Sequence, residues 1–286
     1  MKSLNYWSVP GGLENTLDAV EFMRVAQENR FPAVEVAIGE TSEGGSIGLD
    51  TSENRCKELL TVAHEMGVSI ASAASGLFWS RSLGDATEET RGRARNDLVK
   101  MLQITSWLGC KTLLTIPGSV DVFFLPDRPR LPYDHVWKYA SEGIASMLPI
   151  AEKCGVRMGI ENVWNKFLLS PQEMAAFIDQ FNSPFVGAYV DVANLMRVGH
   201  PQDWLRHLGK RVVGIHFKDY RVSVGTIDGF VDLLEGDVDW PEVMAAIKEI
   251  GYDGPIPAEM IPLYRHFPGV RLANTSNAMD AILSLA

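Results

Sequence analysis

The sequence has few cysteines and no long hydrophobic run. Its 286 residues include 3 cysteines, Cys56, Cys110 and Cys154, and these stand singly in the chain. Without a CxxC pair, the sequence indicates neither a disulfide framework nor a thiolate zinc site, and we expect reduced thiols. It contains no apolar run of the length that spans a membrane, and its first residues lack the apolar stretch of a signal peptide. We therefore expect a cytoplasmic protein that does not enter membranes.

Positive charge is also scarce. The chain has 26 Lys and Arg residues against 36 Asp and Glu residues, which gives a formal net charge of -10 at pH 7. A nucleic-acid surface needs clustered Lys and Arg to neutralise phosphates, so this balance argues against a nucleic-acid partner. We expect small molecules as partners instead.

Short apolar runs alternate with long segments of helical period along the whole chain. This alternation is typical of parallel strands joined by crossover helices. Glycines that follow helical segments, such as Gly155 and Gly251, predict helix ends, and Ser170-Pro171 and Asp239-Trp240-Pro241 predict helix starts. We expect one α/β domain, a (β/α)8 TIM barrel over residues 1–286. The predicted strands begin near Leu4, Ala33, Ser69, Thr112, Arg157, Val186, Val212 and Pro255.

Two connections, residues 119–132 and 222–237, are longer than normal connectors. Both follow predicted strands, so we expect them on the C-terminal face of the barrel, where active sites of this fold are built. We interpret them as lids or subunit contacts.

The last four predicted strands each end in a residue that can bind a cation: Glu161, Asp191, His216 and Glu259. Each residue alone has an ordinary structural explanation, such as a helix cap. The strands are neighbours in a barrel, however, and their C-terminal ends converge on one mouth. Three carboxylates and an imidazole form a hard ligand set for one divalent metal ion, for which we place Mn²⁺ first and Mg²⁺, Co²⁺ or Zn²⁺ as alternatives.

The motifs around these four residues carry a resemblance. The sequence resembles the sugar phosphate isomerase/epimerase family in four segments: residues 160–162 (IEN), 190–194 (VDVAN), 214–219 (GIHFKD) and 258–260 (AEM). This family has the xylose-isomerase-like TIM barrel and includes the 3-epimerases of tagatose, psicose and ribulose. The resemblance implies that all four residues bind the metal and that Glu161 and Glu259 also act as acid and base. It also implies that many members are homo-oligomers, which we expect here.

A 3-epimerase removes a proton from carbon beside a carbonyl and returns it on the opposite face. The cation stabilises the enediolate that forms, and two carboxylates work from opposite sides. We expect Glu161 and Glu259 in these roles, while Asp191 and His216 are ligands only. The direction of proton transfer stays open.

Substrate contacts are expected from polar and aromatic side chains near the predicted mouth. Better-known free-ketose epimerases carry a His where this chain has Asn194, and an acidic residue where it has Leu168 or Leu169, so the sugar stays open. Lys218 and Asp219 are expected as a pair that orients His216 or Glu259. The expected substrate-binding residues are Asn194, Arg221, Trp164, Asn165, Lys218, Trp7 and Glu35.

The leading hypothesis is therefore a metal-dependent 3-epimerase of a ketose or ketose phosphate. Alternatives on the same barrel are an aldose-ketose isomerase and a lyase or dehydratase that acts on a keto-cyclitol or a 3-keto-glycoside. A DNA repair endonuclease needs more histidines at strand ends, and a noncatalytic sugar-binding protein would bind metal without proton exchange.

Overall fold

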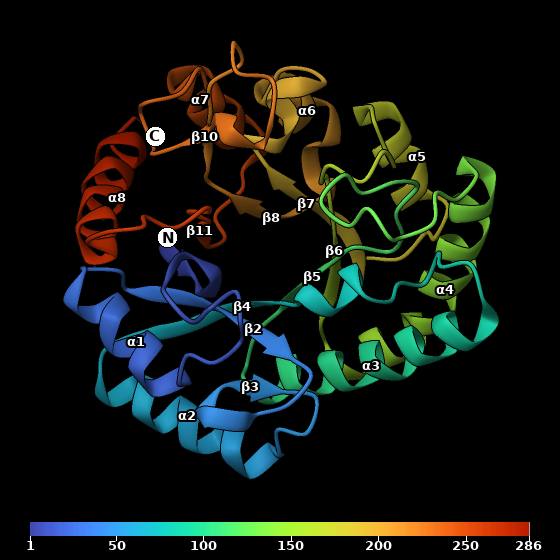
Figure 1. Cartoon of the computed structure of the whole chain (residues 1–286), viewed down its shortest axis with the longest axis horizontal. Coiled ribbons are helices and arrows are strands. Elements are labelled where there is room, and N and C mark those ends of the chain that lie inside the picture. The colour runs from blue at the N-terminus through green and yellow to red at the C-terminus, as the bar shows by residue number, and fades with distance from the viewer. Residues whose placement is uncertain (286) are drawn as a thin grey trace.

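The computed structural model of the chain describes residues 1–285, which form a ring of eight parallel strands (Figure 1). The strand order around the ring is β11, β1, β2, β4, β5, β6, β7, β8. The ring closes between Phe217, just beyond β8, and β11, because Phe217 N donates to Pro257 O at 2.9 Å and Glu259 N donates to Phe217 O at 3.0 Å. The strands are β1 (Lys2–Asn5), β2 (Ala33–Gly39), β4 (Ser69–Ala74), β5 (Thr112–Thr115), β6 (Arg157–Glu161), β7 (Val186–Asp191), β8 (Val212–His216) and β11 (Ile256–Ala258).

Helices alternate with these strands and surround the ring (Figure 1). Together they confirm the predicted (β/α)8 barrel. None of the helices in residues 1–285 is long and apolar enough to cross a membrane. The helices are α1 (Ala19–Glu28), α2 (Glu53–Glu65), α3 (Glu88–Trp107), α4 (Tyr133–Cys154), α5 (Pro171–Asp179), α6 (Pro201–Leu208), α7 (Trp240–Ile250) and α8 (Pro268–Leu283).

The predicted helix boundaries are confirmed at four places. The Ser170 hydroxyl accepts a hydrogen bond from Glu173 N at 3.2 Å and begins α5, and Asp239 caps α7 in the same way through Glu242 N. Gly155 and Gly251 follow α4 and α7 in the left-handed conformation, with φ of 64° and 66°. Such caps satisfy backbone groups that a helix end leaves unpaired.

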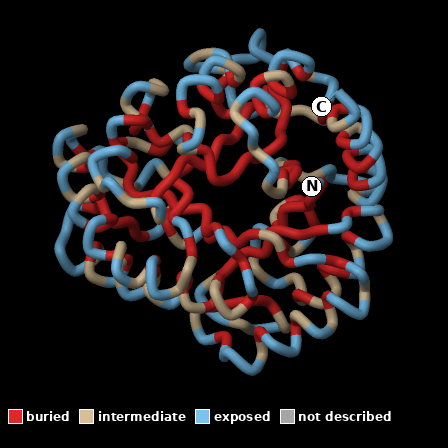
Figure 2. Tube along the Cα trace, turned by 180° about the vertical axis from the view of Figure 1, so that it is seen from behind, coloured by how far each residue is buried: buried red, intermediate tan, exposed pale blue. Residues whose placement is uncertain are grey.

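The strands are buried and the outer turns of the molecule are exposed, as Figure 2 shows from behind. Inside the ring, the Tyr189 ring of β7 lies against two glycines of its neighbours. A Cβ atom on Gly214 of β8 would stand 2.4 Å from this ring, and one on Gly159 of β6 would stand 2.9 Å from it. Glycine at these two positions makes room for Tyr189 in the barrel interior.

The two long connections follow β5 and β8, as predicted. In the first, Phe124 packs against Trp79 at 5.0 Å between ring centroids, and Phe123 packs against Trp164 at 6.1 Å. The second was expected to be loop, but it contains β10 (Phe230–Val231), which pairs antiparallel with β9 (Asp219–Tyr220) just before the connection. The buried Asp219 carboxylate holds this segment, because it accepts hydrogen bonds from Leu234 N, Val238 N and the Trp240 indole. Asp219 therefore supports the segment and contacts neither His216 nor Glu259 through these bonds.

Candidate metal centre

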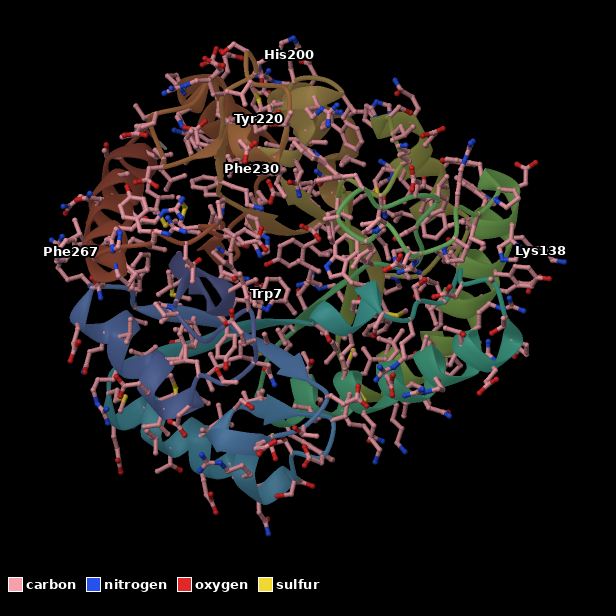
Figure 3. All side chains as sticks on the ribbon, viewed as in Figure 1. Trp7, Lys138, His200, Tyr220, Phe230 and Phe267 are labelled. Atoms are coloured by element: carbon pink, nitrogen blue, oxygen red, sulfur yellow. The ribbon has the colours of Figure 1, made fainter. Side chains whose placement is uncertain are left out.

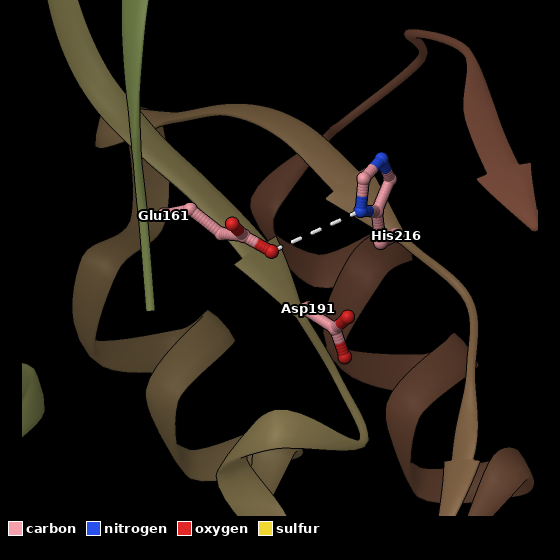
Figure 4. A group of neighbouring side chains, drawn as sticks. All are labelled: Glu161, Asp191 and His216. Atoms are coloured by element: carbon pink, nitrogen blue, oxygen red, sulfur yellow. Dashed lines mark ion pairs between the residues drawn. The ribbon is translucent and has the colours of Figure 1, made fainter. Parts of the chain in front are cut away.

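Three of the four predicted ligands come together at the C-terminal ends of adjacent strands. Glu161 ends β6, Asp191 ends β7 and His216 ends β8, and one ligand atom of each lies within 4.8 Å of the others. Figure 4 shows the three side chains directed toward a common point, with the His216 Nδ1 to Glu161 Oε1 distance of 4.0 Å dashed. All three residues are buried. Parallel strands place them together because their C-terminal ends share one face of the barrel.

Two atoms of this group are buried without a hydrogen-bond partner in residues 1–285: Asp191 Oδ2 and His216 Nδ1. The other oxygen of Asp191 is satisfied, since Ala193 N and Asn194 N donate to Oδ1 at 2.9 and 3.0 Å. An unsatisfied buried polar group costs roughly 1–3 kcal/mol. A divalent cation at this point would satisfy both atoms and the Glu161 carboxylate, so the donor set fits the predicted metal.

Glu35 supports the metal centre from inside the barrel. His216 Nε2 lies 2.5 Å from Glu35 Oε1, which leaves Nδ1 directed toward Glu161. Asn5 Nδ2 also donates to Oε1, and the hydroxyls of Ser72 and Tyr189 donate to Oε2. Glu35 is 0% exposed, and both its oxygens are occupied by protein donors. Glu35 was expected at the substrate, and the structure places its carboxylate behind His216, where protein donors occupy both oxygens.

Glu259 lies just after β11 at the same mouth but outside the group of three mutually close ligands. Its Oε2 accepts a short hydrogen bond from Lys218 Nζ. The same ammonium lies 3.4 Å from Asp191 Oδ2. Lys218 is only 3% exposed, so this charge is surrounded by protein. The sequence predicted a substrate or orienting role for Lys218, and the structure shows it between two of the four predicted ligands.

Burial and neighbouring charges shift the pKa values of these groups. Burial and the Glu259 carboxylate raise the pKa of Glu161 well above its usual range. Burial also raises the pKa of Asp191, although Lys218 opposes the shift. Burial lowers the pKa of His216, but the facing carboxylates, Glu35 first, outweigh it and raise this pKa to about 9. Without a cation, the centre therefore holds protons that a bound metal would displace.

The other expected substrate residues differ in their burial and in their contacts. Asn194 and Asn165 are buried, and their amides donate to the backbone at Asn162 O and Gly118 O, so they hold loops together. The Trp164 indole donates to Asn194 O at 2.9 Å, and its ring faces Phe230 at 5.0 Å. Arg221 is exposed and donates to Glu235 O at 2.7 Å, so it is not brought to the metal centre.

Trp7 follows β1, which lies across the ring from β6. Figure 3 shows it near the middle of the ring, whereas Tyr220 and Phe230 lie together near β9 and β10. The Asn5 amide oxygen accepts a hydrogen bond from Trp7 N at 2.8 Å, while the Asn5 amide nitrogen donates to Glu35. One chain of hydrogen bonds therefore connects the position of Trp7 with that of His216.

Sequence reasoning missed three residues that shape the centre: Tyr189, Ser72 and Asn162. The Asn162 amide exchanges hydrogen bonds with the backbone of Asp191 and joins the ends of β6 and β7. A signal existed for Tyr189, since it stands two residues before Asp191 in the same strand and must point to the same side. Ser72 carried no such signal, because its contact with Glu35 spans two strands.

Most of the chain matches a known family. The family described as Xylose isomerase-like TIM barrel matches residues 23–277. The chain belongs to this family. The resemblance drawn from the strand-end motifs is thereby confirmed.

Individual relatives of this family member are epimerases. SgbU of Escherichia coli K12, described as a candidate L-ribulose-5-phosphate 3-epimerase, is 27% identical over 255 residues, which cover 87% of this chain and 85% of SgbU. The structure of D-psicose 3-epimerase with D-tagatose from Clostridium cellulolyticum H10 aligns with a TM-score of 0.78 and 16% identity, over 99% of this chain and 98% of that chain. The IolI protein with a bound zinc atom also aligns with a TM-score of 0.78, at 14% identity and over 99% and 98% of the two chains. These structures confirm the fold.

Proposed function

We propose that this family member is a metal-dependent 3-epimerase of a ketose or ketose phosphate. The observation that carries the proposal is the buried group of Glu161, Asp191 and His216, in which Asp191 Oδ2 and His216 Nδ1 have no hydrogen-bond partner among the described residues. A second carboxylate, Glu259, lies at the same mouth. The epimerases among its relatives support this choice, and the zinc atom bound by IolI supports a divalent metal in a protein of this fold.

Glu161, Asp191 and His216 would hold the cation. When bound, the cation supplies Lewis-acid stabilisation of the negative charge that develops on the substrate oxygens. Glu35 keeps the His216 ring in position, because the Nε2 side of the ring is fixed and Nδ1 stays available. Mn²⁺ remains the metal that we place first.

Glu161 and Glu259 exchange the proton at C3. One carboxylate takes the proton as the C3–H bond breaks, and the electron pair moves toward the C2 carbonyl oxygen. The other carboxyl then gives a proton to the opposite face of C3, which inverts the centre.

A depression across the ring from β7 and β8 favours an uncharged sugar as the substrate. It has a volume of about 360 Å³ and is lined by the end of β2 and by residues that follow β1, β2, β4 and β5, among them Trp7 and Trp79. Of these strands, β2 and β4 lie across the ring from β7 and β8. Aromatic rings suit the apolar face of a sugar. Among the described residues that line the depression, Glu40 is the one charged side chain, and a phosphate would need cations there.

Three basic residues that could meet a phosphate already have protein partners. Lys166 pairs with Asp121 at 2.5 Å on the surface, Arg221 binds the Glu235 carbonyl, and Lys218 binds Glu259. The ketose is therefore the preferred substrate in this proposal, and the ketose phosphate is its competitor.

The test is incubation of the Mn²⁺-loaded protein in D₂O with D-tagatose, D-psicose, L-ribulose and L-ribulose 5-phosphate, followed by NMR. We expect deuterium at C3 with inversion, faster for the uncharged ketoses. Glu161→Gln and Glu259→Gln should each abolish the exchange. Glu14→Gln changes an exposed carboxylate and serves as the control.

Each other result points to a different function. Deuterium at C1 or C2 with formation of an aldose would make the protein an isomerase. Loss of water or of an aglycone from a keto-cyclitol or a 3-keto-glycoside would make it a lyase. Metal binding without exchange in any sugar would contradict catalysis.

A further inference from the structure

A second depression lies beside the ends of β6 and β7, and the proposed reaction does not use it. It has a volume of about 240 Å³. Asn162 and Asn194 line it, and in the chain they closely follow the candidate ligands Glu161 and Asp191. The second depression therefore adjoins the candidate metal centre on the side of β6 and β7, whereas the first depression, lined by Trp7, lies across the ring.

Arg197 brings a positive charge to the second depression. Its guanidinium stacks on the Trp164 ring, with 4.7 Å between the guanidinium carbon and the ring centroid. No carboxylate within residues 1–285 pairs with Arg197, whereas Lys166, the other cation of the lining, pairs with Asp121 at 2.5 Å. Stacking fixes the plane of a guanidinium and leaves the N–H groups at its edge free. Such a group matches two oxygens of a phosphate, sulfate or carboxylate.

The ring that carries this charge is itself held in place. Trp164 Nε1 donates to Asn194 O at 2.9 Å, which joins the segments that follow β6 and β7. The Trp164 ring also contacts Phe230 of β10, with 5.0 Å between ring centroids, and Figure 3 labels Phe230. The platform under Arg197 is therefore preorganised, which lowers the entropic cost of binding a small anion.

From this arrangement we infer that the second depression is an oxyanion subsite, in which Arg197 binds a phosphate or carboxylate group of a small molecule. Two sources supply this chemistry: the phosphate of a ketose phosphate whose C3 lies at the metal centre, or a separate anion. An uncharged ketose needs the first depression alone, so the subsite serves its competitor or a ligand apart from both sugars. The inference rests on the proposed function only for the first source.

The first experiment measures sulfate binding to the Mn²⁺-loaded full chain by isothermal titration calorimetry at constant ionic strength, with a repeat on metal-free protein. Arg197→Met should bind sulfate at least about tenfold more weakly in both, because a charge-assisted hydrogen bond is lost while an apolar stem stays on Trp164. Arg197→Lys keeps the charge but not the planar pair of donors, so its affinity should lie between. Arg93→Met removes an exposed Arg of α3 outside the depression and is the matched control.

Asp121→Asn should change sulfate affinity in the opposite direction. It removes the carboxylate that pairs with Lys166, so sulfate should bind about two- to fivefold more tightly, the size of one exposed charge pair. This variant keeps the inference testable if Arg197→Met does not fold. Unchanged sulfate affinity in Asp121→Asn would then contradict an anion in this depression.

C3 exchange in D₂O distinguishes the two sources of the oxyanion. If the substrate supplies it, the KM for L-ribulose 5-phosphate should rise at least about tenfold in Arg197→Met, while kcat and the KM for L-ribulose stay unchanged. If a separate anion supplies it, both KM values should stay unchanged although sulfate binding is weakened. Each of these outcomes supports the subsite and assigns its ligand.

Two results would overturn the inference: no sulfate binding to the wild-type protein, or equal sulfate affinity in Arg197→Met and Arg93→Met, which would mean an adventitious ion only. Sulfate binding is measured without any sugar, so its result is separate from the epimerase test. Sulfate binding that depends on Arg197, without C3 exchange in any sugar, would contradict the proposed reaction and leave the oxyanion subsite intact.

Discussion

Single side chains at the metal centre have functions that depend on partners far away in the sequence. Glu35 and His216 are 181 residues apart, yet they share a hydrogen bond in the barrel interior. The Glu35 carboxylate orients the His216 ring and compensates its positive charge, as carboxylates behind metal-binding histidines do in other proteins. Burial raises the pKa of Glu35, but His216 outweighs this and lowers the pKa, so the carboxylate stays ionised.

Removal of this charge should weaken the metal centre. We expect Glu35→Gln to lower Mn²⁺ affinity by roughly 10–100-fold, because the second partner of a metal-binding His sets its orientation and basicity. Ser72→Ala removes a different hydrogen bond to Glu35 and should have a smaller effect. Chelator competition measures both, and equal losses in the two variants would show that only the packing matters.

A second prediction for single residues concerns the protons that His216 and Glu161 release when the metal binds. In metal-free protein the pKa of His216 is raised to about 9, so the ring is protonated at pH 7 and must lose a proton when the metal binds. Apparent Mn²⁺ affinity should therefore fall about tenfold for each unit that the pH drops below 9. Protonation of Glu161, whose pKa is also raised, steepens the fall at lower pH.

Calorimetric titration of Mn²⁺ at pH 7, in buffers that differ in ionisation enthalpy, measures the number of released protons. We expect at least about one per metal ion, the count for a single displaced imidazole proton. A heat of binding that does not depend on the buffer would contradict the protonated state of His216.

The packing of adjacent strands positions the side chains of the candidate centre. The interior of the ring is shaped by β6, β7 and β8 together, since Gly159 and Gly214 leave the space that the Tyr189 ring fills. The Tyr189 hydroxyl reaches Glu35 on β2, across the ring. A change in the strand interior therefore reaches the metal ligands without touching them.

Gly214→Ala tests this connection. The new Cβ would meet the Tyr189 ring at 2.4 Å, so Tyr189 must move. We expect the free energy of unfolding to fall by roughly 1–3 kcal/mol, the usual cost of overpacking a core, and Mn²⁺ affinity to fall with it. Gly269→Ala in α8 is the matched control, because its Cβ meets nothing within 4 Å. Urea unfolding and metal titration of both variants measure the effects, and unchanged metal affinity in Gly214→Ala would separate Tyr189 from the centre.

At the scale of the whole molecule, the closed ring brings together carboxylates that repel one another. Glu161, Asp191 and Glu259 are buried within one mouth, and Lys218 and His216 compensate only part of their charge. A divalent cation at the candidate centre would complete the compensation. Its binding would then be coupled to folding.

Removal of metal should destabilise the protein. A ligand at 100 times its Kd adds about 2.7 kcal/mol of stability, so excess EDTA should lower the Tm of the Mn²⁺-loaded protein by several degrees, about 5 °C. Asp191→Asn should be insensitive to EDTA because it lacks a ligand charge. Differential scanning calorimetry measures the shifts, and an equal response of both proteins would place the stabilising metal elsewhere.

Sequence by itself determined the fold and predicted the candidate ligands at the strand ends. Strand and helix periods are local, and parallel strands in a barrel bring their C-terminal ends to one face, so Glu161, Asp191 and His216 could be placed together from the sequence. Their convergence is a property of the fold class. The metal, the subunit number and the cellular location stay predictions.

Tertiary structure alone decided which side chain meets which inside the mouth. Glu35 was expected at the substrate but lies behind His216, and Arg221 was expected at the mouth but lies on the surface. Lys218 was found between Asp191 and Glu259. These contacts join segments that are distant in sequence. The direction of each side chain depends on the twist of the ring and on the space that neighbouring side chains leave. Local periodicity contains no information about either.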